Sequence, residues 1–349
     1  MAEQPLRVGV TGLGKMGLLH AAVVSGAGIS KLAAVADPSD VMLGVFRQHR
    51  PDVAVYKDHD EMLGSESLEA VFITAPSFLH VPMCLRCIER GVPFFVEKPL
   101  ATNSAEARAL VDALKKKPLT NGVGYMGRYQ ETFLKAKEAL AAKALGKLIN
   151  LRATMYVSQL FRRGKGWRYD RKMSGGGVLI TQNSHLVDLL LWYFGPVEWV
   201  SGQTRSWYSD GVEDFAHGYL RFASGLSGFL DTSWSVRHHR TVDICIEVEG
   251  ENGTLTVTDD TVKLFLDDGA AGLPAGWRIW RLPDLFTGVE FDVGGPAYTR
   301  EDLAFLDAVK SRQMLECDVR SACRVQEVLD ALYESAAQRG APVAIEGRT

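Results

Sequence analysis

The feature that most constrains the fold of this chain is a glycine-rich turn between two short apolar segments near its N-terminus. Residues 6–11 (Leu-Arg-Val-Gly-Val-Thr) predict a buried strand, and the next six residues carry glycines in the spacing GxGxxG. Residues 18–25 then predict a helix, and residues 31–36 predict a second strand that ends at Asp37. This order of strand, glycine turn, helix, strand and acid is typical of a unit that binds a dinucleotide.

Each glycine of the turn has its own expected role. Gly12 permits a tight turn, Gly14 lets the backbone approach a pyrophosphate, and Gly17 lets the helix pack close to the strand. The N-terminus of the helix offers free N–H groups and a partial positive charge to the phosphates. A glycine turn with a purely structural role is the alternative. We expect all six residues of the turn to lie against the cofactor: Gly12, Leu13, Gly14, Lys15, Met16 and Gly17.

The acid after the second strand bears on which cofactor is bound. Asp37 lies 20 residues after Gly17, where a carboxylate can accept hydrogen bonds from the hydroxyls of the adenosine ribose. A carboxylate there would repel a 2′-phosphate, so we expect NAD as the cofactor and NADP as the alternative. The cations Lys15 and Arg47 would weaken that preference.

Strand and helix patterns keep alternating up to about residue 125. The further strands are predicted at 53–56, 70–74, 93–96 and 120–125, and the further helices at 39–49, 58–63, 80–90 and 104–116. Strands that alternate with helices indicate a parallel sheet with helices on both faces. We therefore expect residues 1–124 to form a doubly wound α/β domain that binds NAD. Residues 125–349 should form an α+β domain for substrate binding and oligomerisation.

Polar groups follow several of the predicted parallel strands. Besides Asp37, these are Ser77, His80 and Lys98, and ligands of such sheets lie outside the carboxyl ends of the strands. Lys98 precedes a proline, which favours an extended backbone, and an extended lysine at the end of a strand can reach a ligand. A solvated lysine at a strand end is the alternative.

The second half of the chain has a different pattern. A helix is predicted at 130–142 and a long strand at 148–158, and later strands are predicted at 197–205, 213–223, 226–236, 241–249, 254–258 and 262–266. Turn signals such as Ser224-Gly225 and Asn252-Gly253 join these strands, which indicates an open, mostly antiparallel sheet. Because one face of an open sheet needs a cover, we expect a homodimer or homotetramer formed through this sheet.

A long basic loop precedes the later strands. It combines the aromatic residues Phe161, Trp167 and Tyr169 with six cations and a single acid, Asp170. Aromatic rings suit a sugar ring and arginines suit a carboxylate or phosphate, and loops of this length are often functional. A solvated loop is the alternative. The cations are Arg162, Arg163, Lys165, Arg168, Arg171 and Lys172.

Residues 178–194 predict one apolar helix that follows Gly175-Gly176-Gly177. A helix this apolar is mostly buried, yet Thr181, His185 and Asp188 recur at the spacing of one helix face. Burying such a polar stripe is costly unless its members have partners. We therefore interpret His185 as a functional residue, and a core histidine with ordinary hydrogen bonds is the alternative.

Charge, cysteine content and hydropathy exclude several classes of protein. The chain has 39 Lys and Arg residues against 42 Asp and Glu residues, for a net charge of −3, whereas binding to nucleic acid needs a basic excess. Five cysteines make no disulfide framework, and the pair Cys84 and Cys87 lacks the further ligands of a zinc site. We therefore expect no metal and a reduced, cytoplasmic setting. The sequence shows neither a secretory signal nor the roughly 18–20 apolar residues that span a membrane.

Taken together, these motifs resemble the Gfo/Idh/MocA family of glucose–fructose oxidoreductase and inositol dehydrogenase relatives, over essentially the whole chain. The matching segments are Gly12 to Gly17, Ala75-Pro76-Ser77-Phe78-Leu79-His80, Glu97-Lys98-Pro99, Trp167-Arg168, Gly175-Gly176-Gly177 and His185-Leu186-Val187-Asp188. The resemblance implies a Rossmann domain followed by an α/β domain built on an open sheet. It also implies an NAD(H)-dependent enzyme that acts on a secondary hydroxyl or ketone of a sugar, a sugar acid or a cyclic polyol.

The resemblance also implies roles for single residues. Lys98 would hydrogen-bond the reacting hydroxyl and stabilise developing negative charge, and His185 would take or return the hydroxyl proton. The remaining cofactor contacts would be Ala75, Pro76, His80 and Glu97, with Lys98 shared between cofactor and substrate. The remaining substrate contacts would be Arg128, Tyr156, Trp167, Arg168, Thr181 and Asn183.

One position departs from the family pattern. Inositol dehydrogenases of the family commonly carry an aspartate four residues before the histidine, where this chain has Thr181. Threonine cannot act as a base or as a charge partner of imidazolium. Two alternatives therefore remain beside a dehydrogenase. One is an enzyme that recycles tightly bound NAD during an elimination or epimerisation, and the other is a non-catalytic NAD-binding regulator.

Overall fold

The computed structural model describes residues 4–345, which divide into two compact units. The first unit comprises the described residues up to Met126 together with Val289–Cys323, and the second comprises Gly127–Gly288 and the residues from Arg324 onward. The sequence predicted that everything after residue 124 would lie in one domain. The structure instead packs 289–323 with the N-terminal residues. In the described part of the chain, no helix has the length and apolar character needed to cross a membrane.

The first unit is a doubly wound α/β fold, as predicted. Its six strands are all parallel and lie in the order β3-β2-β1-β4-β5-β6. The order of the strands across the sheet therefore changes direction between β1 and β4, and folds of this type bind their ligands at this point. The strands are β1 (Leu6–Thr11), β2 (Ser30–Ala36), β3 (Ala54–Tyr56), β4 (Ala70–Ile73), β5 (Phe94–Val96) and β6 (Asn121–Val123).

Three helices of the first unit, α2, α3 and α5, begin at residues whose side chains cap them. Ser39, Asp58 and Asn103 each accept an N–H from the first turn of the helix that follows, which satisfies donors that the helix itself leaves free. The helices are α1 (Lys15–Gly26), α2 (Asp40–His49), α3 (His59–Ser65), α4 (His80–Arg90), α5 (Ser104–Lys116) and α11 (Pro296–Ser311).

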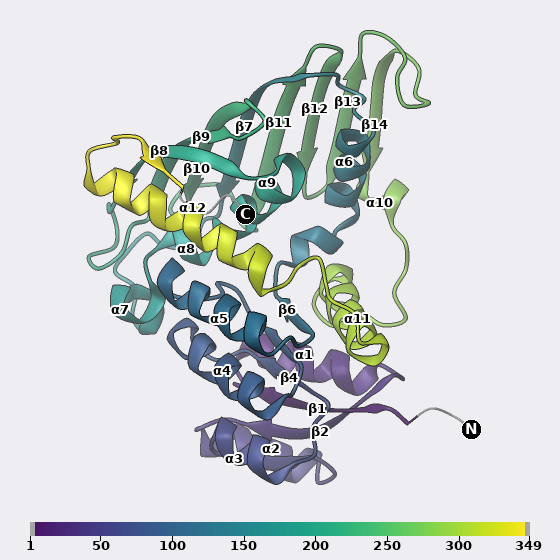
Figure 1. Ribbon diagram of the computed structural model, residues 1–349, viewed down its shortest axis with the longest axis vertical. Helices are drawn as coiled ribbons and strands as arrows, with labels where there is room; N and C mark the ends of the chain where they lie inside the picture. Colours follow the sequence, from purple (N-terminus) through teal and green to yellow (C-terminus); the bar gives the residue numbers. More distant parts are fainter. Residues whose placement is uncertain (1–3, 346–349) are drawn as a thin grey trace. The chain divides into compact units, whose positions relative to one another are not determined.

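Helix α11 joins this unit from far along the chain, and the sequence pattern did not predict it. It packs beside α1 (Figure 1). Its Phe305 ring lies 5.2 Å from the Phe72 ring of β4 and 5.7 Å from the Phe95 ring of β5. The buried rings make α11 part of the same core as strands β1, β4 and β5, which explains why residues 289–323 fold with the N-terminal unit.

The second unit is built on a nine-stranded open sheet in the order β14-β13-β12-β11-β7-β10-β9-β8-β15. All neighbours are antiparallel except β7 and β10, so the prediction of a mostly antiparallel sheet is confirmed. The strands are β7 (Leu148–Tyr156), β8 (Val197–Arg205), β9 (Phe215–Phe222), β10 (Ser227–Ser233), β11 (Asp243–Gly250), β12 (Gly253–Thr258), β13 (Thr261–Leu266), β14 (Gly276–Arg281) and β15 (Val343–Ala344).

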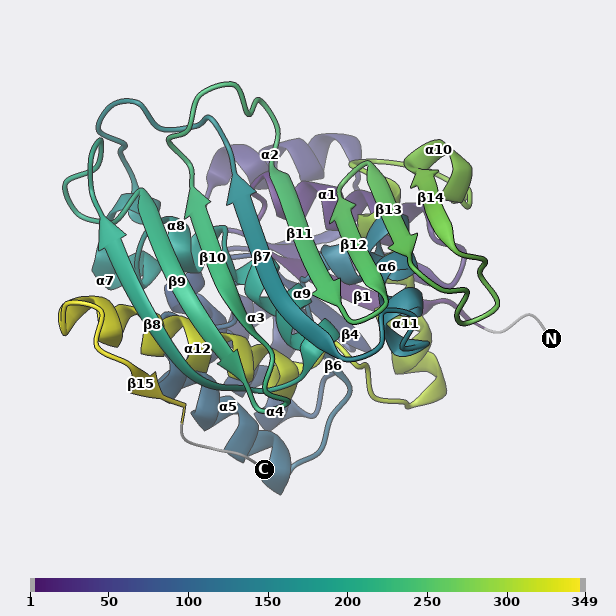
Figure 2. The same ribbon diagram turned by 90° about the horizontal axis from the view of Figure 1, so that it is seen from above.

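Helices of the second unit pack on one face of this sheet, and Figure 2 shows the other face bare. Leu332 and Ser335 of α12 lie against Gly202 of β8. The helices are α6 (Glu131–Ala141), α7 (Arg171–Ser174), α8 (Val178–Thr181), α9 (Ser184–Phe194), α10 (Leu282–Leu285) and α12 (Val319–Ala337), of which α12 begins in the first unit.

The single helix predicted at 178–194 is wrong, because the structure breaks it into α8 and α9. The N–H groups of Gln182 and Asn183 both donate to the carbonyl of Val178, and α9 restarts at Ser184. Asn and Ser side chains compete with helical hydrogen bonds and favour such breaks. Thr181 therefore lies on a different helix from His185 and Asp188, and the spacing of one continuous helix does not apply to the three.

Candidate active site

The glycine turn after β1 has the geometry that a pyrophosphate needs. Gly12 has a φ of +89°, and a Cβ at Gly17 would lie 1.8 Å from the carbonyl oxygen of Gly12. By contrast, a Cβ at Gly14 would have no heavy atom within 4 Å. Gly14 is also the N-cap of α1, and as a glycine it supplies no side-chain cap to the free N–H groups of the first turn. The first and third glycines are thus required by the fold, whereas the second leaves open space at a helix N-terminus.

Asp37 lies directly against this turn. Its Oδ2 accepts the N–H of Leu13 at 2.6 Å, and its Oδ1 accepts the N–H of Ser39 at 2.8 Å. Two main-chain donors therefore hold the carboxylate in place, and each oxygen keeps further acceptor capacity. This arrangement suits the two hydroxyls of an adenosine ribose.

Thr74, at the end of the β4 segment, was not among the predicted site residues. Its hydroxyl lies 2.6 Å from the carbonyl oxygen of Gly12 and 2.9 Å from that of Thr11. It therefore ties β4 to the glycine turn of the neighbouring strand. A polar residue at the end of an otherwise apolar strand was the signal that could have revealed it.

The side chain of His80 contacts main-chain carbonyl groups of two loops. Its side chain is buried, with Nδ1 2.8 Å from the carbonyl oxygen of Pro99 and Nε2 2.8 Å from that of Ala75. Burial lowers the pKa of His80, although the two carbonyl oxygens favour a protonated ring. The side chain joins the loop after β4 to the loop after β5. It thereby shapes the backbone around Ala75 and Pro76, two of the expected cofactor contacts.

Lys98 follows β5, and its own N–H donates to Oε2 of Glu97 at 3.0 Å. Glu97 was predicted as a cofactor contact, yet its side chain is buried and its Oε1 lies 3.2 Å from Nε2 of His20. The structure therefore directs Glu97 into the protein while Lys98 remains partly exposed at the carboxyl end of the sheet. Glycine turn, Asp37 and Lys98 all lie at this edge.

In the second unit, His185 lies half-buried in the first turn of α9. The hydroxyl of Thr181 donates to the carbonyl of Gly177 at 2.7 Å, so it is used within α8. Asn183 is 0% exposed, and neither its Oδ1 nor its Nδ2 has a hydrogen-bond partner among the described residues. An unsatisfied buried amide is costly, and the adjacent Ser184 adds a buried hydroxyl that also has no partner among the described residues.

Arg128, predicted to contact substrate, is held in a buried ion pair. Its Nη2 lies 2.6 Å from Oδ1 of Asp188 and its Nε lies 2.8 Å from Oδ2, and the two side chains are 7% and 1% exposed. The guanidinium also lies 5.8 Å from the centre of the Trp192 ring. This bidentate contact joins the residues just before α6 to α9, three residues after His185.

Glycine is required before α8 by a contact with Glu213 that the sequence did not reveal. The carboxylate of Glu213 accepts the N–H groups of Gly177 and Leu179 at 2.9 Å and the hydroxyl of Tyr333 at 2.8 Å. A Cβ at Gly177 would lie 1.8 Å from the carbonyl oxygen of Glu213. Burial raises the pKa of Glu213, against the effect of these donors. The triplet lets a buried acid cap the start of α8.

The basic loop presents its cations mostly to solvent. Arg168 lies over the ring of Trp167 at 5.4 Å, and Arg163 pairs with Asp210 at 2.6 Å. Both members of that pair are mainly exposed, so the contact stabilises little. Trp167 and Arg168 occupy a short 3-10 turn, residues 167–169, that leads into α7.

Tyr156 is not placed beside His185. Leu151, Ala153 and Met155 of β7 are buried, so strand alternation puts Tyr156 on the opposite, bare face of the sheet. There its hydroxyl is hydrogen-bonded to Asp231, and its ring lies 5.3 Å from that of His239. Burial and the nearby Asp231 raise the pKa of Tyr156. The predicted substrate role of Tyr156 has no support from this placement.

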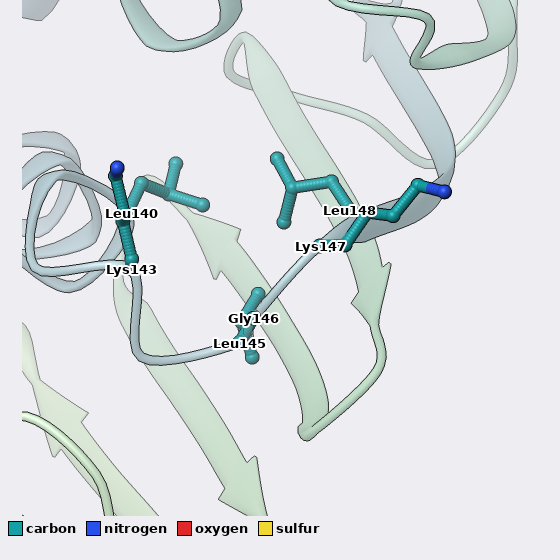
Figure 3. Close-up of a pocket in the computed structure, with 6 residues that line it drawn as sticks. All are labelled: Leu140, Lys143, Leu145, Gly146, Lys147 and Leu148. Carbon is teal, nitrogen blue, oxygen red and sulfur yellow. The ribbon is translucent and has the colours of Figure 1, made fainter.

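An apolar hollow lies elsewhere, where α6 leads into β7. Leu140 and Leu148 point toward one another across it in Figure 3, and its lining also includes Lys143, Leu145, Gly146 and Lys147. None of the candidate functional side chains lines this hollow.

Both halves of the chain match known family models. Residues 6–125 match the oxidoreductase family with an NAD-binding Rossmann fold, and residues 133–256 match the GFO/IDH/MocA C-terminal domain. An inositol 2-dehydrogenase from Rubrobacter xylanophilus is 31% identical over 270 residues, which cover 73% of this chain and 72% of the relative.

Two further comparisons extend over nearly the whole length. A levoglucosan dehydrogenase from Pseudarthrobacter phenanthrenivorans is 22% identical over an alignment of 388 residues, which covers 96% of this chain and 97% of the relative. The crystal structure of GenD2 from gentamicin A biosynthesis, in complex with NAD, is 26% identical, with a TM-score of 0.81. That match covers 99% of this chain and 98% of GenD2.

Proposed function

Because this chain belongs to the Gfo/Idh/MocA family of NAD-binding oxidoreductases, we propose that it oxidises a secondary hydroxyl of a sugar, a sugar acid or a cyclic polyol with NAD, or reduces the corresponding ketone. The observation that carries the proposal is the carboxyl edge of the parallel sheet. There the open space at Gly14, the carboxylate of Asp37 and the side chain of Lys98 follow β1, β2 and β5.

The residues of this edge fit NAD. The free N–H groups at the start of α1 would hold the pyrophosphate, and Asp37 would accept the ribose hydroxyls. Ala75 and Pro76, held in place through His80, would line the nicotinamide side. The carboxylate of Asp37 disfavours a 2′-phosphate, so NAD is the preferred cofactor.

The chain itself has to hold the reacting hydroxyl and move its proton, while bound NAD supplies the hydride chemistry. The Lys98 ammonium donates a hydrogen bond to the substrate oxygen and stabilises the negative charge that develops on it. His185 takes the hydroxyl proton in oxidation and returns it in reduction, a role for which an imidazole with an ordinary pKa of about 6.5 is well suited. The position four residues before His185 is Thr181 at the end of α8, so the chain has no carboxylate there.

A ring substrate with several hydroxyls is the class that the relatives support, since inositol and levoglucosan dehydrogenases are among them. Asn183 next to the His185 turn is fully buried, so in this structure its amide offers no surface for a substrate hydroxyl. Trp167 would stack on the sugar ring and Arg168 would meet an acidic substituent. Arg128 acts indirectly, through its ion pair with Asp188 under α9.

The bare face of the nine-stranded sheet is the proposed contact between subunits of a homo-oligomer. It exposes large apolar side chains on the interior strand β10 and on the edge strand β14, namely Phe229, Trp277 and Ile279. Large apolar side chains left exposed on a sheet face are typical of a surface that a partner covers.

A thermal-shift screen with NAD present tests the proposed substrate class. Inositols, anhydro-sugars, sugar acids and the corresponding ketones are added in turn, because a ligand of the native state raises the melting temperature. We expect a ring polyol or sugar to stabilise the protein beyond NAD alone. Stabilisation only by non-carbohydrate ligands would contradict the proposal. Tightly copurified NAD with no net NADH formation would instead favour a recycling enzyme.

A further inference from the structure

We propose that His20 and Asp302 are positioning residues for Lys98 and act on it through the buried carboxylate of Glu97. This inference rests on the proposed role of Lys98 and adds two residues to the machinery that neither the motifs nor the comparisons assign.

The geometry is a chain of contacts from α11 to the backbone of Lys98. Nδ1 of His20 lies 2.8 Å and 2.9 Å from the two carboxylate oxygens of Asp302, and Nε2 of His20 lies 3.2 Å from Oε1 of Glu97. The other oxygen of Glu97, Oε2, accepts the N–H of Lys98 at 3.0 Å. The imidazole therefore bridges two acids, and the second acid holds the peptide from which the Lys98 side chain starts.

The cluster is buried in an apolar core. His20 and Asp302 are 0% exposed, and the ring of His20 lies 5.4 Å from Phe72 and 5.3 Å from Phe95. Burial alone would lower the pKa of His20, but the charge and hydrogen bonds of Asp302 and Glu97 outweigh it and raise this pKa to about 10. A protonated ring can donate from both nitrogens at once, whereas a neutral ring donates from only one.

Stability alone does not account for such a cluster. Buried ion pairs often stabilise a fold no better than apolar side chains of the same size, and the surrounding rings of Phe72, Phe95 and Phe305 would accommodate an apolar replacement. What an apolar replacement would not provide is a fixed acceptor for the Lys98 N–H. The role of the charged cluster is therefore to hold the Glu97 carboxylate as the acceptor of the Lys98 N–H at the end of β5.

The position of Glu97 explains how the effect reaches Lys98. The N–H of Glu97 donates to the carbonyl of Ile73 in the sheet, so its backbone is already fixed on one side. Its side chain turns back to hold the next peptide. If the Glu97 carboxylate loses its contact with His20, it no longer holds the N–H of Lys98 in place. This N–H is the first main-chain donor after the sheet. A misplacement of about 1 Å at a reacting group can lower a rate about 10²-fold.

The test compares kcat, KM and NAD affinity for Asp302→Asn and His20→Gln with the wild type. We expect kcat to fall about 10- to 10²-fold while NAD affinity changes little. His59→Gln is the matched control, because His59 is another buried histidine of this unit that bonds Thr11 and the carbonyl of Met83 and does not contact Glu97. Its loss should lower the melting temperature and leave kcat near the wild-type value.

A double-mutant cycle separates positioning from general damage. If His20 and Asp302 act through Lys98, Asp302→Asn should lower kcat in the wild-type background and have almost no effect in the Lys98→Met background. Equal fold-losses in both backgrounds would overturn the inference. A fully active Lys98→Met enzyme would instead contradict the proposed function itself, so the two failures are distinguishable.

Amide hydrogen exchange tests the same inference without turnover. In Asp302→Asn and His20→Gln, the peptide that contains Lys98 should exchange faster than in the wild type, while peptides of β1 and β2 keep their protection. Unchanged exchange at Lys98 in a folded variant would contradict the proposed contact chain. So would faster exchange of equal size throughout the unit.

Discussion

The carboxyl edge of the parallel sheet and the helix pair α8–α9 carry the two proposed catalytic side chains, and they are built in different ways. At the sheet edge, close backbone contacts shape the glycine turn, and an acid 20 residues later holds it through a main-chain N–H. At α8–α9, the helices are held by acids and cations from distant segments, Glu213 and Arg128. Substitutions at α8–α9 should therefore act mainly on folding, whereas the sheet edge also has positions, such as Gly14, where they should act on ligand binding alone.

The largest expected effect comes from breaking the buried pair under α9. Asp188→Asn leaves the Arg128 guanidinium without its carboxylate, and breaking a buried pair typically costs about 3–5 kcal/mol. Urea unfolding measures this loss, and the folded variant should still bind NAD. Asp210→Asn is the control, since it removes only the exposed pair with Arg163 and should cost no more than about 1 kcal/mol. Equal losses for both variants would show that α9 does not depend on its buried pair.

The glycine turn should separate fold from binding within three residues. Gly17→Ala places a Cβ where the carbonyl oxygen of Gly12 already lies, so it should disrupt the turn, lower the melting temperature and abolish NAD binding. Gly14→Ala meets no atom in the protein and should leave the melting temperature nearly unchanged while weakening NAD. Melting curves and NAD titrations measure both. A larger drop in stability for Gly14→Ala than for Gly17→Ala would contradict the assignment.

Stability should also depend on the protonation of His20. Its pKa is raised to about 10 in the folded state by Asp302 and Glu97, from about 6.5 when unfolded. The stability that this proton contributes is therefore fully present below about pH 6.5 and is lost as the pH rises toward 10. Urea unfolding between pH 7 and about 10 should show a decline that His20→Gln flattens. A decline of equal slope in the variant would assign it to other groups.

The smallest expected effect concerns the choice of cofactor. Asp37→Ser removes the carboxylate that repels a 2′-phosphate and accepts the ribose hydroxyls. The affinity for NADP should therefore rise relative to that for NAD by about tenfold, or about 1.4 kcal/mol. Parallel titrations with both cofactors measure the ratio. Tighter binding of NADP than NAD by the unaltered protein would contradict the role given to Asp37.

The same difference between the two regions decides what could be predicted from the sequence. The strands of the first unit, its glycine turn and Asp37 follow from local patterns, and the structure agrees with them. The contribution of α11 could not be predicted, because Asp302 meets His20 across 282 residues of chain. The break at Gln182 and Asn183 and the capping acid Glu213 likewise depend on long-range packing that hydrophobic periodicity does not show.

Strand alternation bears on one predicted substrate contact, Tyr156, once the boundaries of β7 are known. Tyr156 belongs to the bare face of β7, because Ala153 and Met155 face the helices. The substrate role predicted for Tyr156 came from family resemblance and not from its position. Thr74 was the opposite case, since a polar residue at the end of an apolar strand was visible in the sequence and its contact with Gly12 was not.

The most direct test of the central claim is NADH formation by the wild-type protein and by Lys98→Met and His185→Ala with the ring polyol or sugar that the thermal screen identifies. The account predicts steady NADH production by the wild type, and a loss of kcat of about 10²–10⁴-fold in each variant with NAD binding retained. Wild-type rates in both variants, or no turnover of any ring polyol or sugar by a protein that binds NAD, would contradict it.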